Sequence, residues 1–198
     1  MQHDESNEVL VMFVDVAGST KLYETLGEIA AFTKISSCLA HLGALVDRFN
    51  GSIIKHIGDE VMCVFPCLVS GLQAAIAAQV EMSTSTSLSG LPVRIGCNYG
   101  PVLYKNDDIF GDTVNVAAHL ASMAQAKQIL TSDTCLNDYE AQFDGQEQFI
   151  TSDLFDVGQQ IPNRFLTRFR PKGKQYQVNV HSVIWEGFLE EASTDITF

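Results

Sequence analysis

The sequence has little positive charge. Its 198 residues include 12 Lys and Arg against 24 Asp and Glu, which gives a formal net charge of -12. This surplus of negative charge argues against nucleic acid or an anionic membrane as a general partner. The apolar runs, such as LVMFV at residues 10–14, fall far short of the roughly 20 residues that a bilayer span needs, and no signal-peptide pattern opens the chain. We therefore expect no membrane span in this chain and a cytoplasmic location.

Cysteine is scarce and shows no paired spacing. The five cysteines are an odd number without a C-x-x-C motif, and most stand among apolar residues: Cys38, Cys63, Cys67, Cys97 and Cys135. This distribution predicts reduced thiols in a hydrophobic core. With 46% apolar and 18% charged residues, the chain has the composition of a globular protein, and its length suits one domain.

Hydrophobic periodicity predicts an α+β fold. A β-branched run at residues 8–15 predicts a buried strand, and apolar positions at steps of three and four across residues 22–49 predict one long amphipathic helix. Two short strands, 52–57 and 60–66, form a hairpin at Gly58-Asp59. The remaining pattern predicts a helix through Leu72, Ile76 and Val80, a loop at 83–90, a strand ending at Gly100-Pro101, a helix from Thr113, and strands at 128–132 and 175–186. The order β-α-β-β-α-β indicates a ferredoxin-like core with a C-terminal extension.

Two aspartates stand at strand ends that this core places next to each other. Asp15 closes the first strand and Asp59 lies at the hairpin tip. Either acid alone could be an ordinary turn or cap residue, but two adjacent carboxylates repel unless they are protonated or bridged by a divalent cation. Oxygen ligands without His or Cys favour Mg²⁺ or Mn²⁺ over zinc.

A turn of small residues follows Asp15 and leads into the predicted long helix. Gly18, Ser19 and Thr20 let backbone N–H groups approach a ligand at the helix N-terminus, which suits phosphate. Small residues precede many helices, so this signal alone is weak. Together with the two acids it indicates a site for a metal-bound triphosphate.

Five segments resemble, in order, the signature blocks of the class III nucleotidyl cyclase catalytic domain: VMFVDVAGSTKLYE, GSIIKHIGDEVMCVFP, VRIGCNYGPV, DIFGDTVNVAAHLA and KGKQYQVNVHSVIW. We expect this domain over residues 7–186 and a C-terminal tail at 187–198. The resemblance implies a head-to-tail homodimer with the active site at its interface. There, two Mg²⁺ or Mn²⁺ ions assist attack of the ribose 3′-hydroxyl on the α-phosphate.

The resemblance also implies roles for single residues. The metal ligands of the family match Asp15, Asp59 and the backbone carbonyl of Val16. The residues that recognise the base match Lys55 and Asp108. The residue that orients the ribose matches Asn115, and the residue that contacts the terminal phosphates matches Lys174. A lysine donating to adenine N1 and an aspartate accepting from its amino group complement ATP, whereas guanine presents the reverse pattern. In the family, glutamate at the position of Lys55 marks guanylate cyclases, so an adenylate cyclase is expected. From the residues alone, Lys55 could equally be a solvent-exposed strand lysine.

His119 departs from the family pattern. The family helix reads N-V-A-A-R, and its arginine contacts the α-phosphate in the transition state; here a histidine follows Asn115 by four residues. Histidine is shorter, often neutral near pH 7, and cannot bind phosphate in the bidentate manner of arginine. It either retains a weakened catalytic role or is a polar filler.

Three functions therefore stay open. The first is an adenylate cyclase, and the second is a catalytically weak homologue that acts as a dimerising or nucleotide-sensing module. The third is a cyclase for another nucleoside triphosphate, which the pair of Lys55 and Asp108 weighs against. No sensor domain accompanies the catalytic segments, so we expect regulation by a partner protein or by a further domain.

Overall fold

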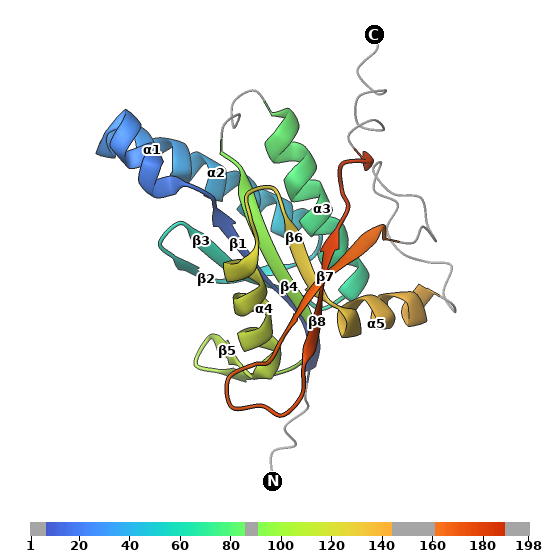
Figure 1. Ribbon diagram of the computed structural model, residues 1–198. Coiled ribbons are helices and arrows are strands. Elements are labelled where there is room, and N and C mark those ends of the chain that lie inside the picture. Colours follow the sequence, from blue (N-terminus) through green and yellow to red (C-terminus); the bar gives the residue numbers. More distant parts are fainter. Residues whose placement is uncertain (1–6, 86–90, 144–160, 189–198) are drawn as a thin grey trace.

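One sheet of eight strands, with helices on both faces, forms the frame of the molecule (Figure 1). The computed structural model describes residues 7–85, 91–143 and 161–188. In chain order the elements are β1 (Asn7–Val16), α1 (Ser19–Leu26), α2 (Glu28–Arg48), β2 (Ser52–Ile57), β3 (Glu60–Phe65), α3 (Leu68–Thr84), β4 (Val93–Lys105), β5 (Asp108–Phe110), α4 (Asp112–Met123), β6 (Ile129–Ser132), α5 (Asp133–Phe143), β7 (Asn163–Phe169) and β8 (Val178–Val183).

The strand order β2-β3-β1-β4-β6-β8-β7 confirms the predicted α+β fold with a C-terminal extension. β1 lies between β3 and β4 and pairs antiparallel with both. The predicted hairpin of β2 and β3 is present, and Gly58 at its tip has a φ of 66°, a conformation that glycine adopts without steric cost. β6 adds to β4 in parallel, and β8 and β7 extend the sheet antiparallel beyond it.

β1 carries hydrophobic side chains on both faces because successive residues of a strand point to opposite sides. Met12 and Val14 belong to the larger core cluster, with residues of α2, α3 and α5. Val11 and Phe13 belong to a second cluster under α4. By the same alternation Asp15 falls on the face of α4, so the fold delivers this carboxylate beside that helix.

α4 lies directly on β4, with no side chain between the two backbones at Gly96. A Cβ added there would stand 2.0 Å from the Ala121 nitrogen and 2.6 Å from the Ala117 carbonyl oxygen. Ala117 and Ala121 face β1 and β3, whereas Leu120 packs in a third cluster against β6 and β8. The small residues of the α4 sequence therefore allow the helix to sit low on the sheet.

The expectation of one long helix across residues 22–49 is wrong. Gly27, with a φ of 78°, separates α1 from α2, and its N–H donates to the Tyr23 carbonyl. The apolar periodicity continues across this break, but the apolar residues around it do not face the core: Leu26 is 46% exposed, Ile29 86% and Phe32 64%. Periodicity alone did not distinguish an exposed apolar row from a core-facing one.

Other boundaries also differ from the sequence expectation. β4 continues past Gly100-Pro101 because it goes on to pair with β5. α3 runs to Thr84, so the predicted loop begins only at Ser85, and residues 86–90 lie outside the described part. The sequence analysis missed β5, α5 and β7. The expected tail starts at Gly187, but Phe188 is packed in the large cluster, and residues 189–198 lie outside the described part, so this boundary stays a prediction.

All five cysteines are free thiols, and four of them are buried, as their apolar surroundings predicted. α2 is long and apolar enough to cross a bilayer by length and composition alone. Core helices meet the same criteria, and α2 buries six residues in this structure: Ala31, Ile35, Cys38, Leu42, Leu45 and Val46. This single helix is therefore weak evidence for a membrane span.

The contact at Gly96 generates a stability prediction. Gly96→Ala forces the α4 backbone off β4 and should lower the free energy of unfolding by about 3 kcal/mol. Gly43→Ala in α2 is the matched control, because its added Cβ meets a single Ile53 methyl at 3.4 Å and alanine favours a helix. Urea unfolding of both variants measures the difference. Equal stabilities of the two variants would contradict the packing described here.

Candidate active site

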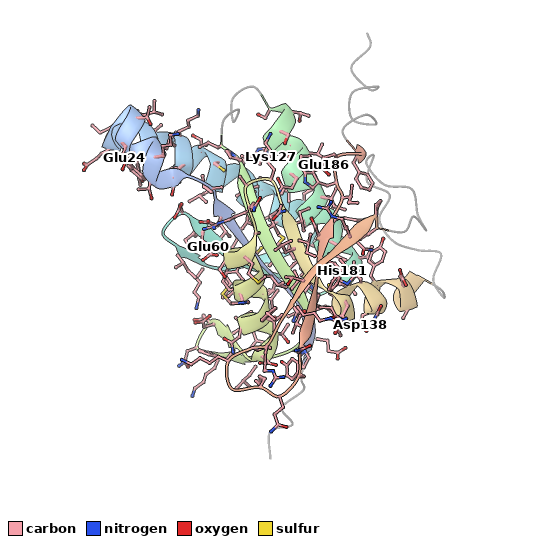
Figure 2. The ribbon with its side chains drawn as sticks, viewed as in Figure 1. Glu24, Glu60, Lys127, Asp138, His181 and Glu186 are labelled. Carbon is pink, nitrogen blue, oxygen red and sulfur yellow. The ribbon has the colours of Figure 1, made fainter. Side chains whose placement is uncertain are left out.

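Asp15 lies between two charged neighbours at the end of β1. It is 9% exposed and stands opposite Glu60 of β3 and Arg94 of β4 in the strand register. The Arg94 Nε donates to the Asp15 carboxylate at 2.5 Å. Figure 2 labels Glu60, which shows that this group of charged residues lies at the hairpin end of the sheet. The three strands thus bring a guanidinium and a second carboxylate to the predicted metal ligand.

The acids at this strand end influence one another. Burial raises the pKa of Asp15; Arg94 opposes this effect, and the charge of Asp59 adds to it. Burial also raises the pKa of Glu60, and the charges of Asp15 and Asp59 raise it further. Asp15, Asp59 and Glu60 are therefore close enough to repel each other, and Arg94 offsets part of that repulsion.

The donor set at this end fits a divalent ion that binds together with phosphate. Across residues 7–85, 91–143 and 161–188, no three His, Cys, Asp or Glu side chains form a complete cation site. Mg²⁺ typically takes one or two carboxylates and fills its remaining positions with water and substrate phosphates. Two aspartates and the carbonyl of Val16 match that requirement.

The predicted phosphate turn follows directly. Gly18 has a φ of 81°, and α1 begins at Ser19 with no side chain capping its first turn. Ser19 is half-buried and Thr20 is exposed. The N–H groups of the first turn of α1 thus follow Asp15 in the sequence after a short connecting turn.

Lys55 and Asp108 form an ion pair across 53 positions of sequence. The Lys55 Nζ lies 2.6 Å from the Asp108 Oδ2, and the Ile109 N–H donates to the other oxygen at 2.9 Å. The hydrogen bond from Lys55 is the main cause that lowers the pKa of Asp108, so its carboxylate stays ionised. Lys55 also lies opposite Met62, a residue of the cluster under α4, and so falls on the same face of the sheet as Asp15. Lys55 is an exposed strand residue, as the sequence alone allowed, but its ammonium is paired with Asp108.

Asn115 and His119 lie on the side of α4 that points away from the sheet, and both are exposed. They border a cavity of about 600 Å³ between α4 and the segment that joins β7 to β8, lined by Asp112, Asn115, His119, Phe169, Arg170, Pro171, Lys172 and Lys174. The His119 ring lies against the Phe169 ring, with centroids 4.2 Å apart. The structure therefore brings Asn115, His119 and Lys174 together in one cavity.

Asp112 ties the β7–β8 segment to the start of α4. The Lys174 Nζ lies 3.1 Å from one oxygen of Asp112, and the Tyr176 hydroxyl donates to the other. Neither Asp15 nor Asp59 lines this cavity. Within one chain, the acidic strand end and the cavity beside Asn115 are separate.

A family comparison decides what kind of domain carries these groups. The family model for the adenylate and guanylate cyclase catalytic domain matches residues 1–154. The chain belongs to this family.

Curated relatives of this cyclase domain are longer proteins. This chain is 29% identical over 143 residues to an adenylate cyclase of Anabaena cylindrica, and the match covers 61% of this chain and 28% of that relative. It is 31% identical over 120 residues to an adenylate cyclase of Streptomyces griseus, with 61% and 30% covered. The chain thus spans less than a third of the length of these relatives.

Solved structures share the fold of the cyclase domain. The adenylyl cyclase CyaB from P. aeruginosa superimposes with a TM-score of 0.70 at 23% identity, covering 89% of this chain and 93% of that one. The catalytic core of a rhodopsin-guanylyl cyclase with converted specificity, in complex with ATPalphaS, gives a TM-score of 0.73 at 19% identity, with 90% and 96% covered.

The sequence analysis of this cyclase domain missed Arg94, Glu60, Asp112 and Arg170. Arg94 and Glu60 become visible as neighbours of Asp15 only when the register of β1 with β3 and β4 is known. Asp112 and Arg170 border the same cavity only because the β7–β8 segment returns to α4. The sequence of β7 shows no hydrophobic pattern that predicts a strand, because most of its residues are exposed and its apolar residues do not alternate with polar ones.

The acidic strand end generates a metal-binding prediction. Mn²⁺ at ten times its dissociation constant should raise the Tm of the native protein by about 3–6 °C. Asp59→Asn should keep the fold, because the residue lies at a hairpin tip, but should lose most of that shift. Asp107→Asn, in the turn before β5, makes the same chemical change away from the strand end and should keep it. Thermal melts with and without Mn²⁺ measure both variants; an undiminished shift in Asp59→Asn would exclude this residue as a ligand.

Proposed function

We propose that this cyclase domain converts ATP to 3′,5′-cyclic AMP and pyrophosphate, as a homodimer with two Mg²⁺ or Mn²⁺ ions at each active site. The observation that carries the choice of ATP is the ion pair of Lys55 and Asp108 at 2.6 Å. It joins one donor and one acceptor on the face of the sheet that also holds Asp15.

This pair is complementary to the Watson–Crick edge of adenine. The Lys55 ammonium can donate to N1, and the Asp108 carboxylate can accept from the exocyclic amine. Guanine has a carbonyl in place of that amine and a proton on N1, so neither protein group could form its hydrogen bond to that base. A site whose polar groups match one base disfavours a base that cannot form the same hydrogen bonds.

Asp15, Asp59 and the carbonyl of Val16 are the residues that would hold the divalent ions. When bound, such ions neutralise the phosphates and lower the pKa of the ribose hydroxyl that attacks. The turn of Gly18, Ser19 and Thr20 offers its N–H groups to phosphate oxygens.

The cavity beside α4 holds the second set of groups. Asn115 orients the ribose through its amide, and Lys174 contributes positive charge toward the terminal phosphates. His119 adds at most a weak phosphate contact, because an imidazole cannot make the two parallel hydrogen bonds of a guanidinium.

The separation of the two sets supports a homodimer. The metal-binding carboxylates lie beside β3 and β4, whereas Asn115 and His119 point outward from α4 toward the β7–β8 segment. One nucleotide contacts both sets if the carboxylates of one chain face the cavity of a second chain. A two-fold axis then generates two equivalent sites.

A catalytically weak homologue that binds nucleotides is the second candidate. The observation that favours it is the packing of the His119 ring on Phe169, which gives the histidine a role in packing without any chemistry. Mass spectrometry of products after incubation with each of the four nucleoside triphosphates and Mn²⁺ separates the candidates. Cyclic AMP supports the proposal, another cyclic nucleotide contradicts the choice of base, and no cyclic product favours the weak homologue.

Reversing the charge of Lys55 tests the recognition of the base. Lys55→Glu should lower kcat/KM for ATP by about 100-fold, because it removes the donor to N1 and places two carboxylates together. Use of GTP should rise only partly. Arg164→Glu, a charge reversal on β7 at the opposite edge of the sheet, should stay within about threefold of the native rate. Unchanged selectivity in Lys55→Glu would show that this residue does not face the base.

A further inference from the structure

The cavity beside α4 concentrates positive charge in an acidic protein. Although the chain carries a net charge of -12, five of its 12 Lys and Arg residues fall within residues 164–174: Arg164, Arg168, Arg170, Lys172 and Lys174. The last three line the cavity, against the single carboxylate of Asp112. The cavity therefore attracts an anion although the protein as a whole repels one.

The cations in the cavity differ in their partners. Lys174 is paired with Asp112, whose second oxygen is taken by the Tyr176 hydroxyl. Across the described ranges, neither Arg170 nor Lys172 makes an ion pair or a hydrogen bond within the chain. Lys174 thus already has a carboxylate partner, whereas the guanidinium of Arg170 has none among the described residues and can offer its five donors to a ligand.

The backbone of Arg170 is held in a fixed place beside α4. Phe169 pairs with Val178 in the last register position of β7 and β8, and its ring packs on His119 at 4.2 Å. Arg170 follows immediately and borders the same cavity as Asn115. The imidazole of His119 thereby anchors the segment that carries the arginine.

We propose that Arg170 is the residue that binds a phosphate group of the nucleotide in this cavity, and that Lys174 and Asp112 position the segment that presents it. A guanidinium binds phosphate with two parallel hydrogen bonds, which neither His119 nor a lysine can make. The cation that the sequence lacks at position 119 is thus supplied by the β7–β8 segment. This inference rests on the proposed function only in taking the phosphate to belong to a nucleotide.

The direct test uses inorganic tripolyphosphate, which has neither base nor ribose. Its binding is measured by calorimetry in EDTA, so that the acidic strand end contributes no metal. Arg170→Gln should weaken binding by about 10- to 100-fold, the effect of losing a charge-assisted hydrogen bond. Arg168→Gln removes the same charge two residues earlier, from a side chain that stacks on Phe165 outside the cavity, and should stay within about twofold.

Each outcome decides the proposal. Selective loss in Arg170→Gln supports it. Equal losses in both variants would assign the binding to general electrostatic attraction and overturn it, and so would a native protein that fails to bind tripolyphosphate.

A rescue variant separates a contact from a change in folding. In Arg170→Gln combined with His119→Arg, a guanidinium returns to the same cavity, and affinity should recover at least tenfold. Thermal melts show whether each variant is folded. Because tripolyphosphate reports on the cavity without turnover, the proposal can hold even if the nucleotide panel yields no cyclic AMP, and it can fail even if the protein is an active cyclase.

Discussion

The contact between the α4 backbone and Gly96 is the constraint on which the arrangement of functional groups depends. Because no side chain separates the helix from β4, the row of Ala117 and Ala121 lies flat on the sheet. The opposite row, with Asn115 and His119, must then point outward. A bulkier residue at position 96 would lift the helix and move both rows. A glycine far from any ligand thus sets the position of groups that we assign to the ribose and the phosphates.

Charge is divided on the two sides of this helix. Three carboxylates and one guanidinium meet at the end of β1, where burial and mutual repulsion raise the pKa of Asp15 and Glu60. The cavity beyond α4 instead holds three cations and one carboxylate. A metal-bound triphosphate is complementary to both regions together. One chain keeps them apart, which gives a physical reason for two chains to share each active site.

The sequence predicted the elements whose signals are local. The hairpin at Gly58-Asp59 and the buried β1 were found because turn chemistry and β-branched runs act over a few residues. The break at Gly27 was missed, since the apolar row continues through it on an exposed surface. β5, with three residues, is too short to show a period.

The residues of the candidate site likewise divide into those that the sequence predicted and those that it missed. The resemblance brought Lys55 and Asp108 together before any geometry was available, and the structure confirms that they touch. Arg94 was out of reach, because its meeting with Asp15 depends on strand register. Arg170 was missed because its place is decided by the packing of Phe169 on His119, a contact between residues 50 positions apart.

The central claim is that each active site needs the acidic strand end of one chain and the α4 cavity of another. Mixing Asp15→Asn with Asn115→Ala chains, each inactive alone, tests it directly. Random pairing makes half of the dimers mixed, each with one intact site of two, so about a quarter of the native rate of cyclic AMP formation should return. No recovery of activity, with mixed dimers demonstrated by differently tagged chains, would contradict the account.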